Sequence, residues 1–168
     1  MRKQHRSVLY NVMFPLWMLV WFPSWLWLAL IPANYLIDRA VLWWSLSEMN
    51  DRQAFCRHHT WKICLAGFAS DFIGSLLLLG AYLSFDAAGT GWAHDVVHGL
   101  GFNPFSNLLS FFITVCAVVL AGFCIYVFDL RILQKAGLTE VQARHSALLL
   151  AVLTAPYLFL FPSGLLYR

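Results

Sequence analysis

Residues 61–85 read WKICLAGFASDFIGSLLLLGAYLSF, an apolar run longer than the roughly 20 residues that a transmembrane helix needs. It lacks the alternation of a barrel strand, so it predicts a membrane-spanning α-helix. Gly67 and Gly74 are small enough to let a neighbouring helix approach closely. Asp71 lies near the middle of the run. A charge at such a depth is costly and usually marks a transport path, a proton relay or a specific partner.

The whole chain has the composition of an integral membrane protein. Of its 168 residues, 61% are hydrophobic and only 11% are charged, whereas a soluble domain averages roughly 25% charged residues. This composition excludes a water-soluble domain. The net charge of +3 comes mostly from short loops, where Lys and Arg set the membrane topology. We therefore expect the lipid bilayer as a partner, and no nucleic acid.

The sequence predicts a single all-α membrane domain over residues 1–168: an antiparallel bundle of four transmembrane helices. A re-entrant or interfacial hydrophobic arm at about 8–22 precedes the bundle. An outer loop, 86–103, separates the second and third crossings. The four crossings are expected at about 24–46, 61–85, 104–129 and 140–161.

Three local signals set these boundaries. Pro23 followed by Ser24 marks the break between the arm and the first crossing. Asn103 followed by Pro104 combines a capping side chain with proline at the first helical position, which predicts the start of the third crossing. The capping box in residues 139–142, TEVQ, predicts the start of the fourth.

Basic residues predict the orientation of the bundle. Lys and Arg near the ends of crossings are retained in the cytoplasm. They occur in loops 47–60 and 130–139, whereas loop 86–103 has none. We therefore expect the first two loops in the cytoplasm and the third outside. The short basic N-terminus fits a bacterial cytoplasmic membrane, with the arm 8–22 dipping into the membrane and returning.

A second carboxylate, Asp38, lies inside the first predicted crossing. Counted from the expected inner ends of their crossings, Asp38 and Asp71 are both roughly 12 to 14 Å deep, so we predict that they meet. Asn34 shares a helix face with Asp38, and Ser75 shares one with Asp71, because each pair is four residues apart. Two carboxylates in an apolar site do not both ionise readily, so one would exchange a proton for another cation or substrate.

Further groups are expected at the same depth. Thr154 would add a hydroxyl to this ion- or substrate-binding site, and Pro156 would free the backbone carbonyl of Val152 as a ligand. Such an oxygen-rich layer suits a proton or a hard cation. Arg39 is a competing partner, because its guanidinium could neutralise Asp71 or extend toward the cytoplasmic surface. The carboxylates would then only hold helices together.

The outer loop contains a candidate metal site. His94 and His98 are four residues apart, which on a helix places both imidazoles on one face. With Asp95 or Asp86 they could hold a metal ion that keeps an open position, as in a hydrolytic zinc centre. A surface amphipathic helix would show the same spacing without metal. Beyond this candidate ion, the cofactor is unknown.

Three functions stay open at the level of sequence. The first is a small transporter, channel or transport subunit with an intramembrane carboxylate site. The second is a membrane-embedded enzyme that acts on a lipid or lipid-linked substrate through the outer-loop cluster. The third is an accessory protein that packs with partner membrane proteins. We expect the first, without catalytic residues, and we expect a homo-oligomer or a partner membrane protein to complete a permeation path.

Overall fold

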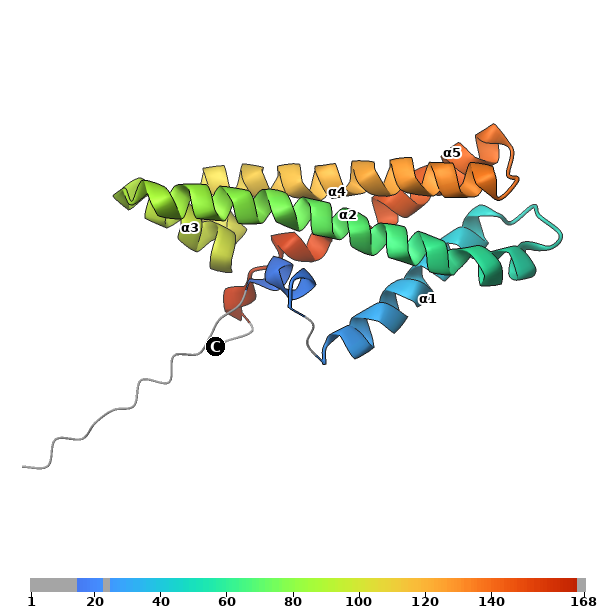
Figure 1. Ribbon diagram of the computed structural model, residues 1–168, viewed down its shortest axis with the longest axis horizontal. Helices are drawn as coiled ribbons and strands as arrows, with labels where there is room; N and C mark the ends of the chain where they lie inside the picture. The colour runs from blue at the N-terminus through green and yellow to red at the C-terminus, as the bar shows by residue number, and fades with distance from the viewer. Residues whose placement is uncertain (1–14, 23–24, 166–168) are drawn as a thin grey trace, which may run out of the picture.

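The computed structural model describes residues 15–22 and 25–165, and the regular elements within these ranges are all helical (Figure 1). This confirms the all-α prediction. The α-helices are α1 (Trp27–Ser45), α2 (Arg52–Ala88), α3 (Gly91–Phe102), α4 (Leu108–Lys135) and α5 (Glu140–Leu153). The short 3₁₀ helices are η1 (Leu16–Val20), η2 (Pro104–Ser106), η3 (Tyr157–Leu160) and η4 (Ser163–Leu165).

Within the described ranges, three helical segments are long and apolar enough to cross a membrane. These are Arg52–Ala88, Leu108–Lys135 and Glu140–Leu160. These three segments support the prediction that the chain is an integral membrane protein. Helix α1 is not among them, since Asn34, Asp38 and Arg39 interrupt its apolar sequence. The predicted antiparallel bundle of four crossings is therefore not confirmed.

Two helices extend beyond the membrane crossings predicted for them. α2 already begins at Arg52, so most of the expected loop 47–60 is helical, and α4 continues past Asp129 to Lys135. The segment from Arg52 to Ala66 contains neither Gly nor Pro. Once a helix has formed, each further residue adds a backbone hydrogen bond whether its side chain is polar or apolar. Hydrophobicity therefore marks the membrane-facing part of a helix and not its ends.

The predicted outer loop 86–103 is largely the helix α3 (Gly91–Phe102), which corrects the expectation of a loop. α2 ends at Ala88 and is capped by Gly89, whose φ of 62° is left-handed, and α3 begins at Gly91. The glycines of this segment mimic a loop signature, but its apolar residues recur at intervals of three and four, as in an amphipathic helix. The buried residues with this spacing are Ala93, Val96, Val97 and Leu100.

Capping side chains fix where the next helices begin. Asn103 caps η2, and Asn107 caps α4, so the long helix begins at Leu108 and not directly after Asn103. The hydroxyl of Thr139 accepts a hydrogen bond from the backbone N–H of Gln142 (3.4 Å). α5 therefore starts where the capping box predicts.

Helices α2 and α4 lie antiparallel and side by side, and they form the frame of the protein (Figure 1). A Cβ added to Gly74 would lie 2.9 Å from the backbone oxygen of Ala117 and 3.0 Å from the Cβ of Ala121. Gly74 therefore permits a close helix contact, as predicted. An added Cβ at Gly67 would meet nothing within 4 Å, so the same prediction is wrong there.

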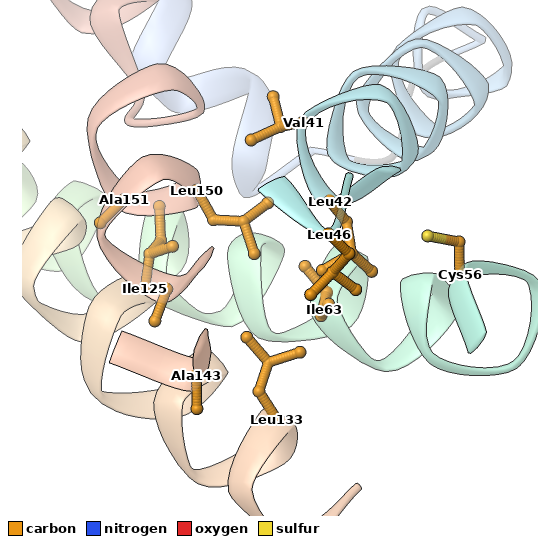
Figure 2. Packing of buried hydrophobic residues seen from close by; sticks show 11 residues of the cluster. Val41, Leu42, Leu46, Cys56, Ile63, Ile125, Leu133, Ala143, Leu150 and Ala151 are labelled. Carbon is orange, nitrogen blue, oxygen red and sulfur yellow. The ribbon is translucent and has the colours of Figure 1, made fainter. Parts of the chain in front are cut away.

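The buried apolar residues form two cores at different levels of this frame. The first core is shown in Figure 2 and comprises Val41, Leu42, Leu46, Cys56, Ile63, Ile125, Leu133, Ala143, Ala147, Leu150 and Ala151. The second comprises Trp17, Leu78, Val96, Leu100, Ala117, Val118 and Phe159. Along α2, Asp71 lies between Ile63 of the first core and Leu78 of the second.

The last span is interrupted between the two cores. α5 ends at Leu153, and residues 154–156 lead into η3 without helical structure. Pro156 lacks a backbone N–H and cannot continue the hydrogen-bond ladder. The predicted crossing 140–161 is therefore a short α-helix followed by a 3₁₀ turn.

A second interruption lies near the N-terminus, where η1 precedes α1. Residues 8–14 of the predicted arm lie outside the described residues, whereas 15–22 are described. η1 contacts α2 and η3. The indole of Trp17 is 2% exposed, and its Nε1 donates a hydrogen bond to the carbonyl of Leu100 (2.9 Å). This part of the arm is therefore packed into the protein.

Candidate functional site

A cavity of about 300 Å³ lies where both interrupted segments meet α1 and α2. Most of its wall is apolar and comes from η1, the start of α1 and the chain around the α5 break. Its principal polar groups are Asn34, Asp38, Asp71 and Thr154. These four residues were predicted as one site from the sequence, and they line a single cavity.

Helix α1 brings two of these groups to the cavity on successive turns. Asn34 and Asp38 are four residues apart and face the same side of α1. The indole of Trp27 stacks on the ring of Phe68 in α2, with the centroids 5.9 Å apart and the planes 11° apart. This contact fixes the first turn of α1 against α2 at the cavity wall.

The carboxylate of Asp38 is almost fully enclosed. It is 5% exposed, and the thiol of Cys64 on α2 donates a hydrogen bond to it. Asp71 is half-buried, and its Oδ1 is buried without a hydrogen-bond partner among the described residues. Asp71 therefore presents a carboxyl oxygen that the protein leaves unsatisfied.

A third carboxylate, Asp129 on α4, was missed by the sequence analysis because the third crossing was expected to end there. Since α4 continues to Lys135, Asp129 lies inside the helix; it is 0% exposed, and neither carboxyl oxygen has a partner among the described residues. Ile125 and Leu133, one turn to either side, belong to the first core. The sequence did contain a sign of this: Ile125 and Leu133 lie four residues before and after Asp129, so the apolar pattern of the helix continues past the carboxylate.

The three carboxylates form one electrostatic group centred on Asp38. Both Asp71 and Asp129 are close enough to Asp38 for their charges to interact with it. In the described part of the chain, the one ion pair joins Arg144 to Glu140 at the surface (2.6 Å). No described Lys or Arg therefore neutralises this group at salt-bridge distance.

Two other predicted site residues, Ser75 and Arg39, lie outside this cavity, and the hydroxyl of Thr154 already donates a hydrogen bond. Ser75 is buried, but its hydroxyl donates to the carbonyl of Phe72 (2.8 Å) on its own helix, and it does not line the cavity. Arg39 lines a separate cavity, described below. Thr154 does line the carboxylate cavity; its hydroxyl donates to the carbonyl of Leu150 (2.8 Å), so its oxygen lone pairs can still accept a hydrogen bond or bind a cation.

The carbonyl of Val152 is not the free ligand that was predicted. The missing N–H of Pro156 does release it from the helix ladder, but the hydroxyl of Tyr157 donates a hydrogen bond to it at 2.5 Å. The residue directly after Pro156 thus supplies a side-chain donor in place of the backbone N–H that proline lacks.

The three candidate metal ligands of the outer segment, His94, Asp95 and His98, lie on α3. They share a cavity of about 410 Å³ with Ser106 and Asn107. In the chain as described, no three His, Cys, Asp or Glu side chains are grouped closely enough to hold a metal ion. The three-ligand metal site therefore stays a sequence prediction without geometric support.

No protein-family model, no curated protein and no solved structure matches this chain. The function must therefore be inferred from the site itself, since function depends on the chemistry of particular groups and not on fold alone.

Proposed function

We propose that this chain is a small transporter, channel or transport subunit, and that the cavity between α1 and α2 holds its proton, cation or small substrate. The observation that carries the proposal is the convergence of Asp38, Asp71, Asn34 and Thr154 on one cavity between two apolar cores. Carboxylate, amide and hydroxyl oxygens are the ligands of hard cations and the stations of proton relays.

The unsatisfied carboxyl oxygens support this proposal. A charged carboxylate buried without a cation is strongly destabilising, so a buried group of this kind binds a proton or a cation, or pairs with a base. Asp71 leaves one buried oxygen unsatisfied and Asp129 leaves two, judged over the residues that are described. An accessory protein that only packed with partners would be expected to have a dry, fully satisfied core.

The interrupted segments are a second line of support. Non-helical backbone at membrane depth is tolerated where it is buried in protein or lines a cavity, and broken helices commonly form the binding sites of transporters. Here η1 and the break after Leu153 both contribute to the cavity wall. On this proposal, the N-terminal arm re-enters the membrane beside η3. A homo-oligomer or a partner membrane protein would complete the path.

Ion flux measured on the purified full-length chain in liposomes tests the proposal. We expect the wild type to move H⁺, Na⁺ or K⁺ down an imposed gradient, as reported by dyes that respond to pH and to each cation. Asp38→Asn and Asp71→Asn should each lower that flux at least about tenfold, because each removes a group that can exchange a proton. Asp86→Asn is the matched control, since Asp86 is exposed and lies outside the cavity.

A hydrophobic carbodiimide provides a test that does not require the transported ion to be known. This reagent couples to protonated carboxylic acids that it reaches from an apolar phase. Mass spectrometry of the treated chain should show addition at Asp38 or Asp71, and the bound cation should protect against it. Unchanged flux in both Asn variants, together with no modification of either residue, would contradict the proposal.

A membrane enzyme that acts on a lipid or lipid-linked substrate is the second candidate. One observation favours it: His94, Asp95 and His98 share a cavity with Ser106 and Asn107. Imidazole and carboxylate groups together can exchange protons with a substrate. The paired variant His94→Ala and His98→Ala would abolish lipid hydrolysis in this case, and it should leave ion flux unchanged if the first proposal holds.

A further inference from the structure

A second, more open cavity of about 920 Å³ lies at the corner between α1 and α2, and the carboxylate site does not use it. Most of its polar side chains carry a positive charge or can donate hydrogen bonds. Those relevant here are Arg39, Asn50, Asp51, Gln53, Arg57 and His58.

The basic groups of this cavity have no acidic partner among the residues that the structure describes. Arg39 is half-buried and approaches from α1, whereas Arg57 and His58 are exposed on the second turn of α2. Asp51 is the acidic residue of the lining, yet neither it nor another described carboxylate lies within salt-bridge distance of Arg39 or Arg57. Arg39 and Arg57 therefore line one cavity from two helices, and no described carboxylate pairs with either guanidinium.

The start of α2 adds backbone donors to the same cavity. The first N–H groups of a helix have no partner within the helix, and the side chain of Asp51, at the N-cap, makes no hydrogen bond to them. Gln53 and Ala54 of this first turn line the cavity. The positive end of the helix dipole therefore lies at the wall of the cavity that Arg39 and Arg57 also line.

Exposed tryptophans place the cavity at the level of a membrane interface. Trp43, Trp44 and Trp61 are 44%, 64% and 53% exposed on the neighbouring turns of α1 and α2. The guanidinium of Arg52 lies 3.8 Å from the ring centroid of Trp43. Tryptophan and arginine side chains gather in this way where lipid headgroups begin.

We propose that this cavity binds the phosphate group of an anionic phospholipid. Arg39 and Arg57 hold the phosphate oxygens, with the first turn of α2 donating from its backbone and His58 donating from a ring N–H. The tryptophans on either side contact the glycerol and upper acyl region. The site is independent of the transport proposal, since none of its lining residues lines the carboxylate cavity.

Asp51 opposes such a ligand and provides a sensitive test. Its carboxylate is exposed at the N-cap and lies in the same lining as the guanidinium groups. Replacing it by Asn removes the repulsion and keeps a residue that is equally suited to an N-cap. A site for anions should therefore bind more tightly in Asp51→Asn than in the wild type.

Native mass spectrometry of the full-length chain in a non-ionic detergent tests the site. We expect phosphatidylglycerol to bind at one tight site, and phosphatidylcholine to bind at least about tenfold more weakly. The paired variant Arg39→Gln and Arg57→Gln should weaken phosphatidylglycerol binding about tenfold or more, and Asp51→Asn should strengthen it severalfold. Arg131→Gln with Arg144→Gln is the charge-matched control, because it removes two positive charges outside the cavity.

Several outcomes would overturn the proposal. Equal losses in the Arg39/Arg57 pair and the Arg131/Arg144 pair would show a general charge effect in place of a site. Weaker or unchanged binding in Asp51→Asn would contradict an anion site, even if the arginine pair failed to fold. Displacement of the lipid by inorganic phosphate at low millimolar concentration would assign the site to a soluble anion and overturn the lipid assignment.

Discussion

The thiol of Cys64 on α2 donates a hydrogen bond to the carboxylate of Asp38 on α1. This bond joins α1, whose apolar sequence is interrupted by polar residues, to the frame helix α2 near the carboxylate cavity. It also gives Asp38 a partner that neither Asp71 at Oδ1 nor Asp129 at either oxygen has among the described residues. Cys64 therefore positions a site residue without lining the cavity itself.

Removal of this thiol should weaken the junction of α1 and α2. A hydrogen bond to a charged or strongly polar group contributes about 1 to 2 kcal/mol, so Cys64→Ala should lower the free energy of unfolding in detergent by that amount beyond the loss of packing. Cys56→Ala is the matched control, since Cys56 is as deeply buried in the first core. Cys64→Ser keeps a donor and should recover most of the difference. Equal losses at Cys64 and Cys56 would exclude a role for the hydrogen bond.

Replacement of Asp129 by Leu should raise stability and lower function. The carboxyl group is 0% exposed, with no described partner at either oxygen, and an apolar residue of similar volume is often more stable in such a place, here by about 1 to 3 kcal/mol. Thermal unfolding in detergent measures this change, and the exposed Asp86→Leu should alter stability by less than about 0.5 kcal/mol. A loss of ion flux with a gain in stability would identify Asp129 as a functional carboxyl. Destabilisation by Asp129→Leu would contradict this reasoning.

Two glycines of α2 should respond in opposite directions to the same substitution. Ala is favoured over Gly inside a helix by up to about 1 kcal/mol, so Gly67→Ala, with open space around its Cβ, should keep or raise the unfolding temperature. Gly74→Ala places a Cβ 2.9 Å from the backbone oxygen of Ala117, and α2 and α4 must move apart. We expect it to lower the unfolding temperature, because overpacking commonly costs about 1 to 3 kcal/mol. A similar response at both positions would contradict the close helix contact.

The all-helical architecture and the capping of α5 could be predicted because each depends on local sequence. Hydrophobic runs identify membrane helices, and the side chain of Thr139 reaches a backbone group only three residues away. The shared depth of Asp38 and Asp71 also follows from helix geometry once neighbouring crossings are assumed, and both residues line one cavity. The length of α2 could not be predicted in this way, because a helix continues past the apolar part of its sequence.

The features that sequence reasoning missed depend on contacts between distant residues. Asp129 looked like the end of a span, and only the packing of Ile125 and Leu133 into the first core makes its position an interior one. The carbonyl of Val152 looked free because the hydrogen bond from Tyr157 forms only once the chain has turned at the break. Ser75 shares a helix face with Asp71 in principle, but α4 approaches so closely at Gly74 that this part of α2 belongs to the packed interface.

The ends of the frame helices predict which segments share a side of the membrane. The α1–α2 and α4–α5 connections lie at one end of the molecule, and the α2–α3 connection lies at the other (Figure 1). If α2 and α4 cross the bilayer, the first two connections face one compartment and the third faces the opposite one. The basic residues of the first two connections would then lie in the cytoplasm.

A membrane-impermeant maleimide applied to sealed vesicles measures this arrangement. Glu48→Cys and Gln134→Cys should react from the same side, and Thr90→Cys should react only from the other, because all three positions are exposed. The wild type is the control, since Cys56 and Cys64 are buried, and Cys116 and Cys124 lie within the apolar part of α4. Reaction of Thr90→Cys from the same side as Glu48→Cys would mean that α2 does not cross the bilayer. The cavity holding Asp38 and Asp71 would then lie at a membrane surface, where a carboxylate is hydrated at little cost and gives no reason to infer transport.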